Sequence, residues 1–291
     1  MKNPIPKLLM WFDASAQDTT AMTDTDVIDW VRVLPFIAVH GACLGVIWVG
    51  WSWGAVGVAA GLYAVRMFAI TGFYHRYFSH RTFETSRLTQ FLFAVIGASS
   101  AQRGPLWWAA HHRKHHRHSD TEHDIHSPHE HGFWWSHMGW ITAPGNFPTD
   151  MHEVRDLARY PELRFLDRFD VLVPALLAVT LFALGGLQML VWGFFVSTVV
   201  LFHCTCFINS LAHQIGKQRY DTGDQSRNSL LLALITFGEG WHNNHHKYPG
   251  SARQGFFWWE IDLTYYGLRF LEALGVIRNL RKPPRRLLKS H

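Results

Sequence analysis

Histidines gather in three short segments of the 291-residue chain, HRYFSH, HHRKHH and HNNHH. Neutral imidazole is a good ligand for iron, copper, nickel and zinc, so these segments indicate a metal site without naming the metal. The eight candidate ligands are His75 and His80, then His112, His115 and His116, then His242, His245 and His246. Because one tetrahedral ion needs only four ligands, the sequence predicts two metals.

The spacing within each segment indicates how the imidazoles are presented. His112, His115 and His116 stand at positions i, i+3 and i+4, which share one face of a helix and can converge on a common volume. The third segment repeats this spacing. His75 and His80 are five residues apart, about 140° around an ideal helix, so we expect them to diverge and to serve one metal each.

A ninth candidate is His213 in the segment NSLAH, with Asn209 one helical turn earlier on the same face. Taken alone, a histidine there is more often a hydrogen-bonded helix-end residue than a ligand. Three acids could orient ligand imidazoles by accepting their free N–H, with ordinary solvated acids as the alternative: Asp120, Asp124 and Glu239.

The other histidines are not predicted to bind metal. His111 adjoins the second segment but lies outside its spaced triad, and His40 and His203 fall in apolar stretches, where polar side chains usually face the bundle or lie near an end. Most histidines of the polar loop are expected at the surface or around the ligands: His118, His123, His126, His129, His131 and His137.

The composition indicates a membrane protein rather than a soluble one. Hydrophobic residues make up 48% of the chain, with 14 Trp and 21 Phe, and the net charge is +5. The basic residues lie beside apolar runs and at the C-terminus, which favours cytoplasmic anchoring at a membrane surface over nucleic-acid binding. The first twenty residues lack the pattern of a secretory signal, and residues 8–12 are expected either to rest on lipid or to form a disordered tail.

Apolar runs predict the architecture. Residues 33–53 and 55–73 are long enough for two spans, and residues 171–207 for two more, broken around Gly185 and Gly186. Residues 88–101 are too short to cross, and a span there would separate the first two histidine segments. Arg32, Arg76 and Arg81 place the histidines in the cytoplasm, with Arg66, inside the second run, expected to snorkel or to pair.

We therefore predict an all-α integral membrane protein with four transmembrane helices in two hairpins. The hairpins cover residues 33–73 and 171–211, and a cytosolic helical cap of residues 74–170 and 212–280 holds the two-metal site. The chain is interpreted as one domain, residues 1–291, that ends in a basic tail, residues 281–291.

Together, HRYFSH, HHRKHH followed by SDTEHDIHSP, NSLAH and GEGWHNNHH resemble the membrane fatty acid desaturases, specifically the delta-9 stearoyl group, over roughly residues 71–249. The resemblance implies two irons and O2 as co-substrate. It assigns the metal ligands to His75, His80, His112, His115, His116, His213, His242, His245 and His246, with Asn209 holding a metal-bound water. It also implies that Trp108 contacts the acyl chain.

The implied reaction is the O2-dependent formation of a cis double bond, at delta-9, in a saturated acyl chain. Removing hydrogen from an unactivated methylene needs an oxidant that side chains lack, so the protein delegates this step to a metal and O2.

Neighbouring aromatic residues could line an acyl tunnel, with packing or interfacial anchoring as the alternative: Trp107, Trp108, Phe133, Trp134 and Trp135. The segments GPLWW and DIHSP resemble those of bacterial members of the family, which implies a bacterial inner-membrane enzyme, and the basic residues predict an active site on the cytoplasmic face.

Departures from the family pattern leave the acyl carrier open. Animal relatives hold the CoA headgroup with an arginine where Ala110 stands here, and with an Arg-Lys pair near Thr142, Ala143 and Pro144. Acyl-CoA, an acyl lipid and an acyl-carrier protein thus remain candidates. No haem-binding HPGG segment or cysteine-rich iron–sulfur motif occurs, which predicts a separate electron donor such as a ferredoxin, a rubredoxin or a b-type cytochrome with its reductase.

Two other functions are compatible with parts of this pattern. A histidine-box alkane or lipid hydroxylase would use the same irons to insert oxygen, although NSLAH and GEGWHNNHH favour a desaturase. A membrane metal transporter should place its ligands within its spans, whereas these clusters fall outside them.

Overall fold

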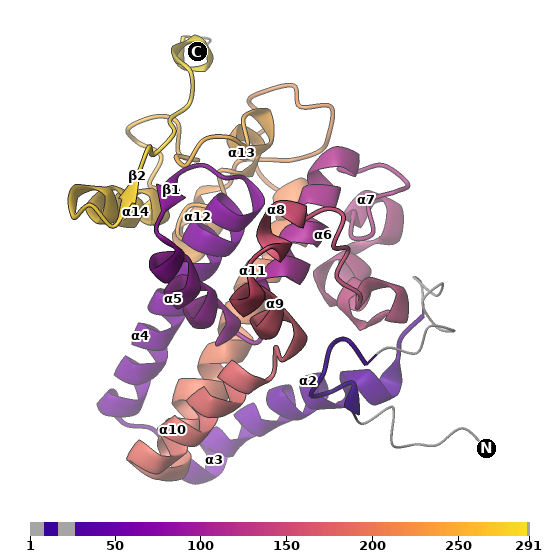
Figure 1. The fold of residues 1–291 in the computed structure, drawn as a ribbon, viewed down its shortest axis with the longest axis vertical. Coiled ribbons are helices and arrows are strands. Elements are labelled where there is room, and N and C mark those ends of the chain that lie inside the picture. The colour runs from indigo at the N-terminus through magenta and orange to yellow at the C-terminus, as the bar shows by residue number, and fades with distance from the viewer. Residues whose placement is uncertain (1–8, 17–26, 290–291) are drawn as a thin grey trace.

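The computed structural model describes residues 9–16 and 27–289, which are mostly helical. In these ranges, three helical segments are long and apolar enough to cross a membrane: Trp30–Val49, Trp53–Ser79 and Leu172–His213. Parts of all three segments form the bottom of Figure 1, and most of the shorter helices lie above or beside them. The chain is therefore divided into an apolar helical layer and a more polar cap.

The first two segments join at a tight turn. Helices α2 (Trp30–Ala42) and α3 (Val46–Val49) lead to Gly50, whose φ of 63° suits a residue without a side chain. Ser52 then caps α4 (Trp53–Phe68) by accepting the Ala55 N–H. This turn is tied to the third segment, because Gln188 Nε2 donates to Val49 O at 2.9 Å.

The third segment is not one straight helix. Gly185 and Gly186 leave the helical conformation near the end of α10 (Leu172–Met189), with Gly186 at a φ of 65°. Helix α10 packs against the π-helical segment η6 (Leu190–Val196), which follows this kink and leads into α11 (Ser197–Ser210). The two glycines thus let the chain fold back on itself, as the sequence predicts for this position.

Arg66 lies in the middle of this apolar layer and is fully buried. It does not snorkel, but donates to Thr198 Oγ1 at 2.7 Å, Ser197 Oγ at 2.6 Å and Ser99 O at 3.2 Å. A buried charge is costly unless its donors are satisfied, so these contacts explain how an arginine is tolerated here. They also fix α4 against α11 and against the end of the helix α5 (Arg87–Ala98), where Ser99 is the C-cap.

Helix α5 (Arg87–Ala98) has 12 residues, about 18 Å of helix, which is too short for a hydrocarbon core of about 30 Å. It packs against the π-helical segment η2 (Ala69–Ser79), which continues α4 into the cap. A Cβ at Gly97 would lie 2.2 Å from the Tyr74 ring, so glycine is required for this approach. The same ring's hydroxyl donates to Ala94 O at 2.9 Å.

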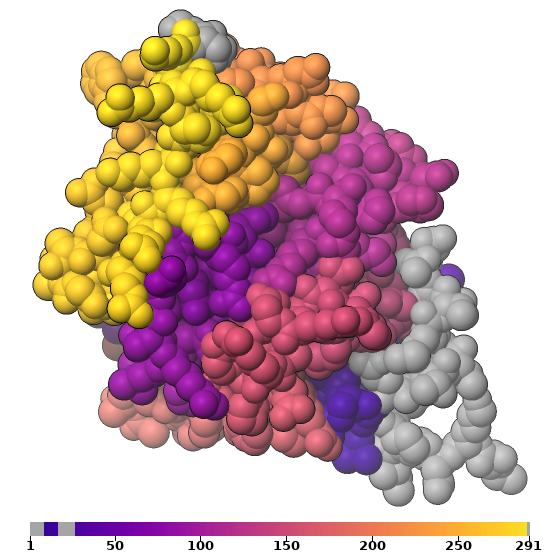
Figure 2. Space-filling view, turned by 45° about the horizontal axis from the view of Figure 1, so that its top comes forward, coloured from indigo at the N-terminus to yellow at the C-terminus, as the bar shows by residue number. Residues whose placement is uncertain are grey.

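The cap is built from short elements around η2. Its helices are α6 (Pro105–His118), α7 (Pro128–His131), α8 (Arg155–Ala158), α9 (Pro161–Arg168), α12 (Leu230–Ile235), α13 (His242–Lys247) and α14 (Leu263–Ala273). Strands β1 (Glu84–Thr85) and β2 (Ile277–Arg278) pair antiparallel. Figure 2 shows the C-terminal part of the chain lying against the segment that contains β1. These contacts enclose a core that includes Phe73, Leu106 and Leu268.

The described part of the N-terminal segment packs on the protein. Met10 is buried, and the Trp11 indole donates to Val31 O at 3.1 Å, whereas Leu9 and Phe12 are exposed. The expectation that residues 8–12 rest on lipid is therefore wrong for Met10, which is buried in the folded chain. For the half-buried Trp11 it stays a prediction. Leu8 lies outside the described residues.

Candidate metal centre

The nine histidines singled out from the sequence form two adjoining clusters. The five-histidine cluster contains His75, His80, His112, His116 and His245, and the four-histidine cluster contains His115, His213, His242 and His246. In each cluster, one ring nitrogen from every histidine lies within 4.8 Å of the others. The clusters meet where the His116 and His246 rings approach to 4.4 Å between centroids.

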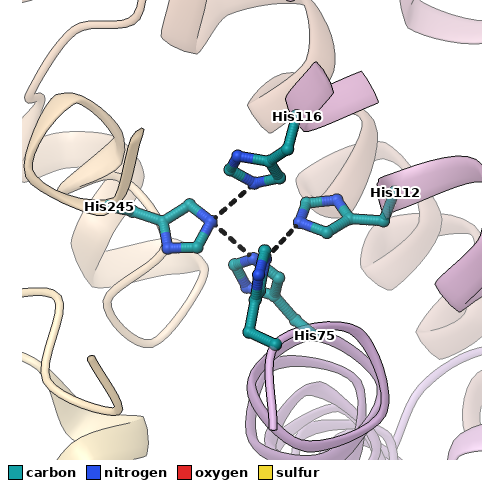
Figure 3. Close-up of side chains that lie close together, drawn as sticks. His75, His112, His116 and His245 are labelled. Atoms are coloured by element: carbon teal, nitrogen blue, oxygen red, sulfur yellow. Dashed lines mark hydrogen bonds between the residues drawn. The ribbon is translucent and has the colours of Figure 1, made fainter. Parts of the chain in front are cut away.

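The Nε2 atoms of the five-histidine cluster point toward one another from three parts of the chain, as Figure 3 shows for four of its members. His245 Nε2 lies 2.9 Å from His75 Nε2 and 2.8 Å from His116 Nε2. His80 Nε2 lies 2.9 Å from His112 Nε2. In the four-histidine cluster, His213 Nε2 lies 3.0 Å from His242 Nε2.

The three histidines of α6 do not converge on one volume, which corrects the expectation drawn from their spacing. His112 and His116 face the five-histidine cluster, and His115 faces the other. Neighbouring residues of a helix differ by about 100° around its axis. The side chains of His115 and His116 therefore point in different directions, each into a different cluster. Helix α13 divides its histidines in the same way, because His245 alone joins the five-histidine cluster.

The expected divergence of His75 and His80 is also wrong. Their rings lie 5.0 Å apart and belong to the same cluster. The reason is the backbone of η2, where π-helical hydrogen bonds run between residues five apart and bring such residues to one face. An ideal α-helix, assumed from the sequence, would have separated them.

Carboxylates contact the Nδ1 atoms of four of these imidazoles, whose Nε2 atoms face the clusters. His213 Nδ1 donates to Asp120 Oδ2 at 2.7 Å, His115 Nδ1 donates to Asp124 Oδ2 at 2.9 Å, and His75 Nδ1 donates to Glu239. All three acids were candidates from the sequence. Each bond fixes the tautomer, so that the Nε2 lone pair is directed into the cluster.

The fourth carboxylate, Asp224, was missed by the sequence reasoning. Its Oδ2 accepts from His246 Nδ1 at 2.6 Å. Asp224 is 22 residues before His246, in a loop, and no helical spacing links the two. The one available signal was that an acid-bearing loop, DTGDQS, lies between NSLAH and the third histidine segment.

The electrostatics keep most of these rings neutral. Burial lowers the pKa of His80, His112, His116, His242 and His245 well below the ordinary value for histidine, and neighbouring histidines add to the effect. Burial also lowers the pKa of His246 to about 4, although Asp224 opposes the shift. His115 differs, because burial lowers its pKa but Asp124, Asp120 and Asp224 together outweigh burial, so that the pKa is raised.

These features fit a bound cation. Although buried, His246 Nε2 has no hydrogen-bond partner, and its Nδ1 proton is already committed to Asp224. Buried polar atoms are rarely left unpaired, and several neutral imidazoles facing one another present converging lone pairs. A metal ion in each cluster would satisfy these atoms, and clusters of five and four nitrogens exceed the single tetrahedral zinc site considered from the sequence.

The other histidines that the structure describes lie outside both clusters. Among them, His126 is buried beside His115 and Asp124, and it forms a third possible metal group with those two residues. His40, His203 and His137 form a separate chain, with ring nitrogens 3.1 and 2.9 Å apart in succession. His129 contacts His213 O, His111 contacts Trp107 O, and His123 is exposed.

Two cavities adjoin the clusters. The larger, about 440 Å³, is lined mainly by apolar side chains such as Phe36, Pro174 and Phe202. The smaller, about 40 Å³, is lined by residues that include His75, Glu239 and His242. Both cavities are lined by Trp108, His112, Thr205 and Asn209.

Trp108 therefore lies between the cavity and the metal centre. Its ring stacks on His112, with 5.0 Å between centroids, and lies 5.9 Å from His75. Trp107 also lines the larger cavity. The other aromatic candidates for a tunnel are elsewhere: Phe133 stacks on His137, Trp135 donates to Ile125 O, and Trp134 is exposed.

A helical chain with membrane-length apolar segments, two buried histidine clusters and an apolar cavity beside them defines the class of membrane metalloenzymes that act on apolar substrates. Residues 30–272 match the family model described as fatty acid desaturase. The chain is 40% identical to an sn-1 stearoyl-lipid 9-desaturase of Anabaena variabilis, over 90% of this chain and 97% of that protein. This protein belongs to the fatty acid desaturase family.

Other relatives act on different carriers and positions, according to their names. A chloroplastic palmitoyl-monogalactosyldiacylglycerol delta-7 desaturase of Arabidopsis thaliana is 42% identical over 80% of this chain and 63% of its own length. An acyl-CoA 5-desaturase of Anemone leveillei is 38% identical over 92% of this chain and 87% of its own. The protein is thus a fatty acid desaturase, an oxidoreductase of lipid metabolism, and its relatives span several substrates.

Proposed function

We propose that this desaturase introduces a cis double bond at delta-9 of a saturated acyl chain carried on a membrane lipid. The observation that carries the proposal is that Trp108, His112 and Asn209 line both the apolar cavity and the small cavity among the metal-centre histidines. An acyl chain in the larger cavity would run directly past the centre. The names of relatives from cyanobacteria, stearoyl-lipid and palmitoyl-lipid 9-desaturases, support the position and the carrier.

Two irons are the proposed metals, one in each histidine cluster, and Asn209 is proposed to hold a metal-bound water. The ligands would be the nine clustered histidines, since imidazole suits iron and the Nδ1 partners aim their Nε2 atoms inward. Iron bound there would supply the oxidation with O2 that no side chain can perform. In the balanced reaction, two hydrogens leave adjacent methylenes, two external electrons and two protons are consumed, and O2 becomes two waters.

The protein's own residues would position the substrate and exclude water. Apolar side chains of the larger cavity would hold the acyl chain in place, and Trp108 would fix the reacting carbons against the His112 side of the centre. Asp120, Asp124, Asp224 and Glu239 would keep four imidazoles in a single orientation throughout the cycle. Arg76 in turn holds Glu239 through a 3.0 Å ion pair.

The proposed topology has four transmembrane helices in two hairpins, residues 33–73 and 171–211, within one domain of residues 1–291. The kink at Gly185 and Gly186 supports the division of the third apolar segment into two spans. With the cap and its histidines on the cytoplasmic face of a bacterial inner membrane, external electrons would come from a soluble or membrane-bound donor. A ferredoxin, a rubredoxin or a b-type cytochrome with its reductase would suffice.

Expression in a host that lacks its own desaturase tests the proposed function. We expect a new cis-delta-9 fatty acid, found first in intact membrane lipids rather than in the acyl-CoA pool. Fatty-acid profiles measured by gas chromatography after separation by lipid class would report the position and the carrier together. A hydroxylated product, or a product that accumulates first as acyl-CoA, would contradict the proposal.

Replacing Trp108 with alanine is expected to lower desaturation about tenfold or more while the metal content stays at the wild-type level. Trp108 lines the cavity but offers no ligand nitrogen to either cluster, so its loss should loosen the substrate and leave the metals in place. Product formation and the iron-to-protein ratio are measured on the same preparation. Trp108→Phe should retain more activity, and a loss of iron in proportion to activity would contradict a role in positioning substrate.

A further inference from the structure

Two arginines line the same part of the larger cavity. Arg32, in the first turn of α2, and Arg103, just before α6, both lie against Phe147, with their Cζ atoms 3.8 and 5.5 Å from its ring centroid. Arg103 also lies over the Trp107 ring. They are 71 positions apart in the sequence, so only the folded chain brings them together.

Acidic side chains lie near both arginines, Asp29 and Asp170 near Arg32, and Asp167 and Asp170 near Arg103, without pairing every guanidinium N–H. Arg103 Nη2 donates to Phe147 O at 2.8 Å. Among the described residues that line the cavity, the formally charged ones are Arg32, Arg103 and the single acid Asp170. Asp170 Oδ2 lies 3.2 Å from Arg103 Nε, but neither atom makes a well-aligned hydrogen bond. Arg32 Nη2 is likewise buried without a hydrogen-bond partner.

Unpaired guanidinium N–H groups in a cavity indicate an anionic partner. A buried donor without an acceptor costs free energy, and guanidinium binds phosphate through short, charge-assisted hydrogen bonds. Arg32 lies two residues after the start of a helical segment of membrane-spanning length, and residues at the ends of such segments are expected at the level of the lipid headgroups. A phosphate there would be joined to acyl chains that enter the cavity from the membrane.

We propose that Arg32 and Arg103 bind the phosphate of a phospholipid whose acyl chain occupies the cavity, and so select phospholipid over uncharged glycolipid as the acyl carrier. The inference rests on the proposed function of this cavity as the acyl site. It names the carrier more narrowly than that proposal does. Acyl-CoA also carries phosphate, but the position of Arg32 at the end of an apolar segment favours a phosphate that belongs to the membrane.

The first test measures binding and does not depend on catalysis. Purified full-length protein is offered an equimolar mixture of phosphatidylglycerol and monogalactosyldiacylglycerol, and the retained lipids are counted by native mass spectrometry. We expect the wild type to prefer the phospholipid about tenfold, and Arg32→Gln and Arg103→Gln each to reduce the preference about tenfold. An unchanged ratio, or an equal loss of both lipids, would overturn the inference.

The second test separates carriers by kinetics. With stearoyl-phosphatidylglycerol, we expect each variant to raise KM about tenfold with little change in kcat, whereas KM for the stearoyl galactolipid stays constant. An effect confined to stearoyl-CoA would overturn the assignment to phospholipid. Arg269→Gln is the matched control, because Arg269 is exposed, does not line the cavity, and interacts with Tyr265 and Glu272 of its own helix.

The two proposals can fail separately. If the wild type retains phospholipid in an arginine-dependent way but forms no unsaturated product, the proposed function fails and the phosphate site stands. If it desaturates both lipids and the arginine variants leave both KM values unchanged, the phosphate site fails and the proposed function stands. Iron content and thermal stability of each variant establish that it is folded.

Discussion

Replacing His245 with alanine is expected to abolish desaturation and to lower the iron bound per protein from two toward one. His245 Nε2 lies within 3 Å of both His75 Nε2 and His116 Nε2, so its removal takes away a central nitrogen of the five-histidine cluster. The loss should exceed the roughly 10–100-fold typical of residues that only orient a ligand. Product yield by gas chromatography and iron by elemental analysis give the two readouts.

His242→Ala provides the same test for the four-histidine cluster, where His242 Nε2 lies 3.0 Å from His213 Nε2. The matched control is His123→Ala, since His123 is exposed and lies outside both clusters. All three variants should still insert in the membrane, which fractionation and detergent extraction can establish. Wild-type turnover in either cluster variant would remove that histidine from the ligand set.

Asp224→Asn is expected to weaken iron binding by about 10–100-fold and to reduce turnover correspondingly. Asp224 accepts the His246 Nδ1 proton at 2.6 Å, and a carboxylate in that position both orients the imidazole and raises its basicity as a ligand. The asparagine is nearly the same size but carries no charge. The measurement is the chelator concentration that removes half of the iron.

Asp221→Asn is the control for this prediction, because Asp221 lies in the same loop but is exposed, and its carboxylate accepts from the backbone N–H of Gly223 rather than from a clustered histidine. The bond from Lys247 Nζ goes to the backbone carbonyl of Asp221, which the substitution leaves unchanged. Its chelator resistance should match the wild type. If Asp224→Asn resists the chelator as well as Asp221→Asn does, the 2.6 Å contact does not tune the metal site. In that case His246 would have to be held by its packing alone.

Local patterns in the sequence determined much of this protein. The apolar runs and the paired glycines at 185 and 186 each report on one short segment, and the structure has helices and a kink where those patterns predict them. The histidine segments predicted which histidines cluster, but their spacings did not predict the grouping. The acids Asp120, Asp124 and Glu239 were also within reach, because each lies close in sequence to a histidine segment. The family followed from the order of the motifs.

Tertiary structure alone decided which histidine joins which cluster. The predicted periodicity assumes an ideal α-helix, in which His75 and His80 would diverge. Because η2 is π-helical, the two residues instead lie on one face. The division of α6 between two clusters depends on where η2 and α13 lie around it, and no spacing within α6 encodes that position.

Contacts between segments that are distant in the sequence could not be predicted from it either. Asp224 lies in a loop and accepts a hydrogen bond from His246. Arg32 and Arg103 are 71 positions apart in the sequence, and both lie against the ring of Phe147. Such pairs depend on the docking of whole elements, whose free energy is spread over many apolar contacts rather than recorded in one motif. The sequence therefore determined the ligand types and the class of chemistry, whereas packing decided the grouping of the ligands and the charges that line the cavity.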